Sequence, residues 1–202
     1  MKISEIFRSL QGEGHLQGRP CTFVRCGGCN LSCRWCDTVY AQTGGAEISL
    51  KMIIDQVHTL QTRYVCITGG EPLLQVEEVK GLARSLDEEG IQVDIETNGT
   101  RDFTPLQPFA SICMDVKCPS SGEVSDLSLL PLLTPADTAK FVVQDEEDCR
   151  YLARVLASFP ISSEIFVSPV FGSDYHPIVR FILDHDLPVR FQVQLHRILG
   201  VP

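Results

Sequence analysis

The sequence predicts an α/β fold, a partial and open (β/α) barrel formed by a single domain over residues 1–202. Strand-like and helix-like segments alternate along the chain, which indicates parallel βαβ units. There are fewer than eight such units, and 202 residues are few for a closed eight-stranded barrel. Polar and glycine-rich groups follow several of the strands, and ligands collect at the carboxyl ends of parallel strands.

The elements follow in order from hydrophobic spacing and from helix caps. A buried strand at 22–25 comes first, and Ser49 can cap a helix that reaches about Leu60. A strand at 64–67 follows, and a helical stripe within 79–86 is stopped by Gly90. The remaining expected elements are strands at 93–96, 112–115, 138–143, 165–167 and 189–193, and helices at about 146–159 and 178–185.

Composition excludes several classes of protein. Hydrophobic residues make up 44% and charged residues 21%, which is typical of a globular domain. The net charge of -9 argues against a general nucleic-acid or membrane surface. No apolar run approaches a membrane span, and residues 1–7 lack the apolar core of a signal peptide, so we expect a cytoplasmic protein. Its nine cysteines should then be ligands or buried thiols rather than disulfides.

Three cysteines stand in a C-x3-C-x2-C run, at Cys29, Cys33 and Cys36. Thiolates at this spacing can converge on one inorganic centre. In a four-iron cluster three thiolates leave one iron open, and an open position is what a catalytic site needs. Cys26 extends the run to four cysteines, so spacing alone also allows a structural zinc site in a zinc-stabilised interaction module.

Other polar groups lie beside the predicted strands. The run Gln11-Gly12-Glu13-Gly14 by itself is best explained as an ordinary turn, and Arg25 fits either a surface charge or a clamp for a carboxylate. Gly69-Gly70-Glu71 after the strand at 64–67 is a stronger sign of a ligand site. The groups expected to share the mouth of the barrel are the cysteine loop, Glu71, Asn98, Lys117 and Ser168.

The cysteine run together with Gly69-Gly70-Glu71-Pro72 resembles the radical S-adenosylmethionine (SAM) enzymes. More narrowly, the chain is similar to the 7-carboxy-7-deazaguanine synthase family from end to end. The segments that carry this resemblance are residues 11–14, 23–25, 29–31, 35–38, 96–100 and 194–197. A radical-SAM activase, which makes a glycyl radical on a partner protein, shares the first two motifs but gives no reason for residues 11–14 or 194–197.

The resemblance implies a shortened radical-SAM partial barrel, usually a homodimer. The family converts 6-carboxy-5,6,7,8-tetrahydropterin to 7-carboxy-7-deazaguanine with loss of ammonia, on the pathway to queuosine and other 7-deazapurines. It uses a 4Fe–4S cluster, SAM and Mg2+, and needs an electron donor such as flavodoxin or ferredoxin. Reduction of the cluster cleaves SAM to a 5′-deoxyadenosyl radical, which abstracts hydrogen from the pterin, while the protein orients the reactants.

The resemblance also implies roles for individual residues. Cys29, Cys33 and Cys36 would hold the cluster, and Thr38, whose hydroxyl could otherwise serve as a local cap, would bind Mg2+ as a hard oxygen ligand. The residues implied for SAM are Trp35, Cys36, Asp37, Gly70, Glu71, Lys117 and Ser168, with the Gly69–Glu71 backbone near the methionine amino group. Those implied for the substrate are Leu10, Gln11, Gly12, Glu13, Arg25, Thr68 and Pro202, with Arg25 on the pterin carboxylate. His196, in the C-terminal motif, is a candidate for lining the site.

Overall fold

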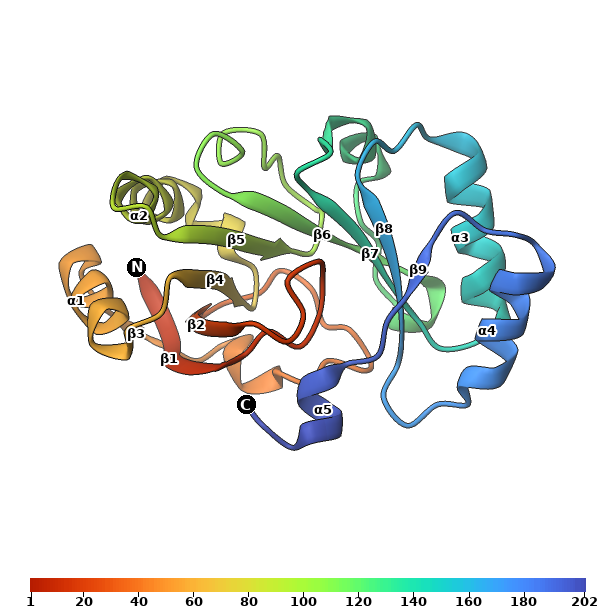
Figure 1. Ribbon diagram of the computed structural model, residues 1–202, viewed down its shortest axis with the longest axis horizontal. Helices are drawn as coiled ribbons and strands as arrows, with labels where there is room; N and C mark the ends of the chain where they lie inside the picture. Colours follow the sequence, from red (N-terminus) through yellow and green to blue (C-terminus); the bar gives the residue numbers. More distant parts are fainter.

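The computed structural model describes residues 1–202 and contains one nine-stranded sheet in the order β3-β1-β2-β4-β5-β6-β7-β8-β9. All neighbouring strands from β2 to β9 are parallel, whereas β1 is antiparallel to both β2 and β3. The sheet curves but does not close, with α1 and α2 outside one part of it and α3 and α4 outside the other (Figure 1). The predicted partial (β/α) barrel is confirmed.

The bounds of the elements are as follows. The strands are β1 Lys2–Leu10, β2 Pro20–Cys26, β3 Ala46–Glu47, β4 Tyr64–Gly69, β5 Gln92–Thr97, β6 Ser111–Lys117, β7 Thr138–Val143, β8 Glu164–Pro169 and β9 Arg190–Phe191. The α-helices are α1 Leu50–Leu60, α2 Val76–Glu88, α3 Glu146–Ser158, α4 Tyr175–Asp184 and α5 Leu195–Leu199. Four 3-10 helices complete the fold: η1 Val39–Ala41, η2 Pro72–Gln75, η3 Pro119–Ser121 and η4 Leu127–Leu132. No helix is both long and apolar enough to cross a membrane.

Local chemistry starts and stops the outer helices. The Ser49 hydroxyl accepts a hydrogen bond from the Met52 amide at 3.3 Å and begins α1, as predicted. The Asp145 carboxylate accepts from two amides of the first turn of α3. Gly90 follows α2 with φ of 72°, a conformation that glycine adopts without steric cost. The apolar faces of these helices and of the sheet form a core cluster of 33 buried residues, whose burial is the main stabilising term.

Three elements differ from the sequence prediction. The strands β1 and β3, at one end of the sheet, had no predicted counterpart, because the residues of β1 are mostly half-buried on both faces and show no clean alternation. The last strand contains only Arg190–Phe191 rather than 189–193, and α5 follows it. The chain leaves the sheet there because the Gln192 side chain exchanges two hydrogen bonds with the Gly14 backbone, at 2.7 and 2.9 Å.

That contact belongs to a set of bonds across the open side of the barrel. The loop after β1 reaches the segment after β9, where the Gln17 amide group donates to the carbonyls of Gly12 and Val193 at 2.8 and 2.7 Å. The Leu195 amide in turn donates to the Gly12 carbonyl at 3.0 Å. The two ends of the curved sheet are thereby tied together, and the loop that holds residues 11–14 is held against the barrel interior.

Candidate functional site

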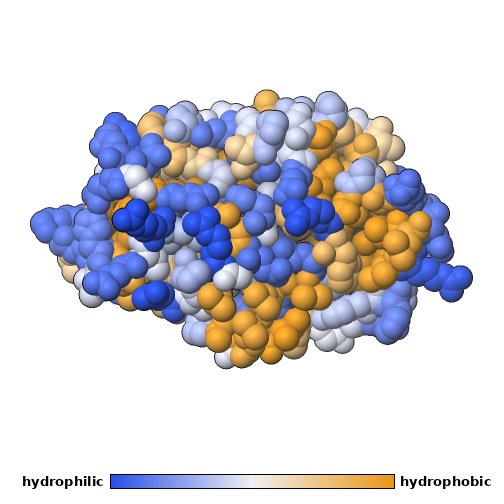
Figure 2. Space-filling view, in the orientation of Figure 1, coloured by the Kyte–Doolittle hydropathy of each residue, from blue (hydrophilic) through white to orange (hydrophobic).

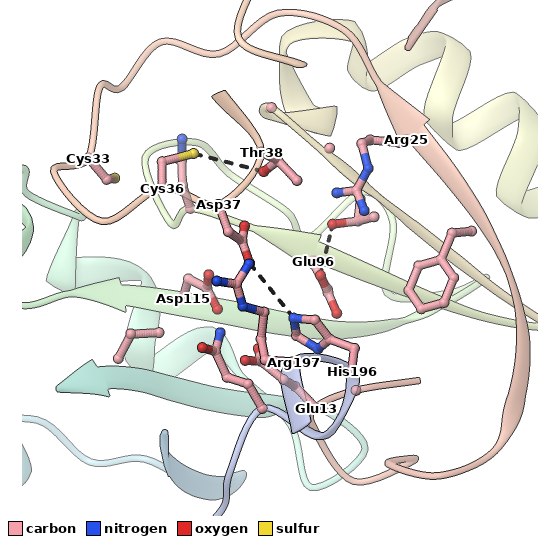
Figure 3. A pocket seen from close by; sticks show the side chains of 18 of the residues that line it. Glu13, Arg25, Cys33, Cys36, Asp37, Thr38, Glu96, Asp115, His196 and Arg197 are labelled. Carbon is pink, nitrogen blue, oxygen red and sulfur yellow. Dashed lines mark hydrogen bonds and ion pairs between the residues drawn. The ribbon is translucent and has the colours of Figure 1, made fainter. Parts of the chain in front are cut away.

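A cavity of about 480 Å³ opens at the carboxyl ends of the parallel strands. Its walls come from β2, β4, β5, β6 and β7, from the loop after β1, from the cysteine loop and from α5. Figure 3 shows acidic, basic and sulfur-bearing side chains converging on it. This is the end of a parallel sheet at which ligands bind in α/β proteins, so the cavity is the candidate active site.

The three cysteines of the C-x3-C-x2-C run all line the cavity and are half-buried free thiols. Burial raises the pKa of Cys29 and of Cys33, while the nearby Lys117 ammonium acts in the opposite direction on both. The loop is fixed by backbone hydrogen bonds, such as that from the Gly28 amide to the Ala41 carbonyl at 2.7 Å. The donor set fits a cluster held by three thiolates with one open position.

The wall beside this loop is bare backbone. A Cβ atom at Gly70 would lie 2.0 Å from the Gly28 carbonyl oxygen and 3.1 Å from Cys29 Cβ, so only glycine fits there. Gly69 has φ of 133°, and its Cβ would overlap the Cys26 backbone. The cavity at the thiols is therefore bounded by main chain, which a small polar ligand can approach closely.

Cys26 does not belong to this thiol group. It is fully buried, it is part of the core cluster and it does not line the cavity. Burial raises the pKa of its thiol to about 12, which suits a packed thiol rather than a metal-bound thiolate. The geometry weighs against a four-cysteine zinc site.

Most residues predicted to contact SAM reach the cavity. Trp35, Asp37, Gly70 and Lys117 line it. The Lys117 ammonium lies 5.7 Å from the centre of the Trp35 ring, and the Trp35 indole N–H donates to the Ser120 hydroxyl at 3.1 Å. These contacts fix the orientation of a flat aromatic surface beside the cysteine loop.

Two predicted SAM residues lie elsewhere. Ser168 is fully buried and does not line the cavity, and its hydroxyl has no hydrogen-bond partner. Its role at the SAM site stays a prediction. The Glu71 side chain is also buried, and its carboxylate accepts hydrogen bonds from the amides of Leu73 and Asn98 and from the Thr97 hydroxyl, at 2.7 to 2.9 Å. Glu71 thus joins the loops after β4 and β5, and only its backbone borders the glycine wall.

Thr38 lies at the edge of the cysteine loop. It precedes η1, but its side chain makes no capping hydrogen bond. Its hydroxyl oxygen is 3.8 Å from Cys36 Sγ and borders the cavity (Figure 3). The hydroxyl is therefore open to a ligand.

All seven residues predicted to bind substrate line the cavity: Leu10, Gln11, Gly12, Glu13, Arg25, Thr68 and Pro202. Arg25 is the most constrained of them. Its Nε donates to Glu5 Oε1 at 2.7 Å, its guanidinium lies 5.6 Å from the centre of the Phe7 ring, and its side chain is 14% exposed. The terminal guanidinium nitrogens have no hydrogen-bond partner and point into the cavity (Figure 3).

Four charged residues of the cavity were missed: Glu96, Asp115, Lys140 and Arg197. Three of them, Glu96, Asp115 and Lys140, lie on β5, β6 and β7. On β5 and β6 the signal was a charge at every second position, as in Asp94 and Glu96, since alternate residues face the same side of a sheet. Lys140 is the one charged residue of β7 and had no such signal.

Helix α5 brings His196 and Arg197 to the cavity. The His196 Nε2 lies 3.7 Å from Asp37 Oδ2, and the nearby imidazole lowers the pKa of the Asp37 carboxyl. The His196 ring packs so closely on Gly12 that a Cβ there would lie 2.0 Å from its Nδ1. The absence of a side chain at Gly12 therefore allows α5 to sit over the site.

A polar network extends from the cavity wall into the sheet. Glu96, which lines the cavity, accepts hydrogen bonds from the Thr68 hydroxyl at 2.8 Å and from the Gln11 amide group at 3.3 Å. Asp94, two residues before it on β5, accepts from Ser111 and from the Tyr64 hydroxyl. Burial, followed by the charge of Glu96, raises the pKa of the Asp94 carboxyl to about 7.

Comparison with known proteins gives one consistent family. The Radical SAM superfamily profile matches residues 23–111. A 7-carboxy-7-deazaguanine synthase of Methanospirillum hungatei is 50% identical over the whole chain and 86% of that protein, and one of Koribacter versatilis is 36% identical over the whole chain and 98% of that protein. The crystal structure of QueE from Escherichia coli has the same fold, with a TM-score of 0.74 and 24% identity over 96% of this chain and 94% of that one. The chain belongs to the 7-carboxy-7-deazaguanine synthase family.

Proposed function

We propose that this protein converts 6-carboxy-5,6,7,8-tetrahydropterin to 7-carboxy-7-deazaguanine with release of ammonia, a radical SAM lyase step in the biosynthesis of queuosine and other 7-deazapurines. The main support, beside family membership, is that one cavity joins three convergent thiols to an anchored arginine. The first fits an iron–sulfur centre, and the second fits a carboxylate ligand.

Cys29, Cys33 and Cys36 would hold a 4Fe–4S cluster, and the glycine wall at Gly69–Gly70 leaves room for the amino-acid end of SAM beside it. When bound, the cluster and SAM supply the radical that removes a hydrogen atom from the pterin. The protein's part is to hold SAM against the Trp35 surface, orient the substrate and keep water away from the reacting atoms.

The substrate end of the cavity offers complementary groups. The unpaired guanidinium nitrogens of Arg25 suit the pterin carboxylate, and the Thr38 hydroxyl would ligate Mg2+ beside it. Glu13 Oε1 is buried without a hydrogen-bond partner. A buried carboxylate oxygen needs a donor, and the N–H groups of the aminopyrimidinone ring of a pterin can supply one. Pro202 also lines the cavity and would contact the substrate there.

We also propose a homodimer, an electron donor such as flavodoxin or ferredoxin, and a cytoplasmic location. Figure 2 shows a hydrophobic patch at the lower edge of the molecule, over α5, where Ile198 and Leu199 are 57% and 51% exposed. Exposed apolar surface of this kind favours a protein partner. The nine free thiols suit a reducing compartment such as the cytoplasm.

An anaerobic assay tests the proposed reaction. The reconstituted protein is incubated with SAM, dithionite, Mg2+ and the carboxypterin, and 7-carboxy-7-deazaguanine and ammonia are measured together with 5′-deoxyadenosine. We expect product and ammonia in equal amounts, and Cys29→Ala should form neither. A protein that binds iron and cleaves SAM but leaves the carboxypterin unchanged would contradict the proposal and favour an activase instead.

A further inference from the structure

Four charged side chains form a ladder across the barrel interior: Lys117, Asp115, Lys140 and Glu13. The Lys117 ammonium lies 3.2 Å from Asp115 Oδ2, and the Lys140 ammonium lies 3.0 Å from Asp115 Oδ1. Lys140 also donates to Glu13 Oε2. The side chains of Lys140 and Glu13 are only 5% and 9% exposed, so the charges alternate in a nearly dry setting.

A contribution to the stability of the folded protein does not readily explain the ladder. Removing an ion from water costs several kcal/mol even after relaxation, and apolar residues of similar volume often stabilise a fold as well as a buried ion pair does. The three strand residues lie on β6 and β7, whose other buried positions are apolar except for Thr138. A reason other than folding is therefore required for Lys140.

The Glu13 end of the ladder indicates what Lys140 does. Lys140 binds only one oxygen of Glu13, and the other, Oε1, is buried without a partner. Glu13 borders the cavity from the loop between β1 and β2, and only Lys140 binds its carboxylate. Without Lys140, its carboxylate would be free to rotate toward water or toward the Gln11 side chain, whose amide oxygen the Glu13 backbone N–H contacts at 3.3 Å.

We propose that Lys140 is a positioning residue, which holds Glu13 Oε2 so that Oε1 is presented to N–H donors of the substrate, with Asp115 fixing the Lys140 ammonium from the opposite side. The proposal rests on the proposed function, in which Glu13 binds the carboxypterin. Lys140 has both carboxylates as partners and offers no free charge to an anionic ligand, so it acts through Glu13 rather than on the substrate itself.

A kinetic double-mutant cycle tests this in the reconstituted enzyme with SAM, Mg2+ and the carboxypterin. Lys140→Met, Glu13→Gln and the double variant are compared with wild type, and Lys51→Met on α1, whose side chain is 82% exposed, is the matched control. We expect Lys140→Met to raise KM for the carboxypterin by up to about 100-fold, the loss that a misplacement of about 1 Å can cause. The change in kcat should be smaller, because Glu13 binds ground state and transition state alike.

Two further measurements distinguish a positioning role of Lys140 from a purely structural one. The double variant should have a KM close to that of Glu13→Gln alone, since Lys140 would act through that carboxylate, and Lys140→Arg should recover part of the loss with the cluster absorbance unchanged. If Lys140→Met does not fold, Lys140→Arg takes its place in the cycle.

Additive effects on KM, or a KM of Lys140→Met equal to that of wild type, would overturn the role of Lys140 while leaving the proposed reaction standing. Failure of the wild-type enzyme to convert the carboxypterin would instead overturn the proposed function, on which this role depends.

Discussion

The buried carboxyl group of Asp94 makes a specific prediction about stability and pH. Asp94 is 4% exposed, and burial together with the nearby charge of Glu96 raises the pKa of its carboxyl to about 7. In the folded protein the group therefore keeps its proton up to near neutral pH, whereas in the unfolded chain it ionises near 3.8. Asn has the same shape and never ionises, so Asp94→Asn should remove this effect and little else.

The sign and size follow from proton linkage. Between pH 4 and pH 7 the folded state binds more protons than the unfolded state, so Asp94 lowers the free energy of unfolding as the pH rises. The loss is complete above the folded pKa. The gap between 3.8 and about 7 corresponds to roughly 4 kcal/mol at 1.36 kcal/mol per pH unit, of which roughly 2.5 kcal/mol falls between pH 5 and pH 8.

Urea unfolding followed by circular dichroism under anaerobic conditions measures this effect. The free energy of unfolding of Asp94→Asn, minus that of wild type, should grow by roughly 2.5 kcal/mol from pH 5 to pH 8. Asp55→Asn, which replaces a carboxylate with 59% exposure on α1, serves as control and should show no such growth. A difference that stays constant across this range would mean that Asp94 ionises in the folded protein as it does in the unfolded chain, and would refute the reasoning.

Three further predictions concern the site. Arg25→Lys should keep the cluster but lower kcat/KM for the carboxypterin by about 2–5 kcal/mol, a thirtyfold to several-thousandfold loss, because Lys cannot copy the two parallel hydrogen bonds; near-wild-type kinetics would show that the carboxylate binds elsewhere. Cys29→Ala should abolish the brown 4Fe–4S chromophore, and Cys26→Ala, in the core, should retain it; equal loss of iron in both would show that the ligand set is wrong. Thr38→Ala should raise the Mg2+ concentration needed for activity with an unchanged cluster spectrum, since one hard oxygen ligand is lost; an unaltered Mg2+ titration would remove Thr38 from the metal site.

The parallel part of the fold could be predicted because its strands are buried on both faces and its helices have apolar stripes. The strand expected at 138–143 coincides with β7, Thr138–Val143, in which every residue is buried. The sequence could not predict β1, whose side chains are mostly half-buried on each face. β1 is a strand because its backbone pairs with β2 over most of its length. Backbone pairing does not produce an alternation of apolar and polar residues, so the sequence gives no sign of it.

Some residues of the candidate site could likewise be predicted from the sequence, and others could not. Motif residues such as Cys29, Gly70 and Arg25 were predicted, since their spacing or position beside a strand end has a chemical meaning. Lys140 and Arg197 were not, because their importance depends on contacts between distant segments. The Lys140 ammonium meets Glu13 across 127 positions of sequence, and no local pattern encodes such a pairing.

The orientation of the substrate follows from which charged groups of the cavity remain unpaired. Lys140 is bound by two carboxylates, so it does not attract an anion, although it is a buried cation. Arg25 is held by Glu5 through Nε alone, which leaves its terminal nitrogens to receive a carboxylate without breaking that pair. At Glu13 the unpaired group is a buried acceptor, Oε1. A ligand with an anionic end and an end rich in N–H donors could place its carboxylate at Arg25 and its donors at Glu13. In this acidic protein of net charge -9, we propose that selection of an anion depends on the cations of the cavity that keep free hydrogen-bond donors, which are the terminal nitrogens of Arg25 and the guanidinium of Arg197, and not on the number of cations in the cavity.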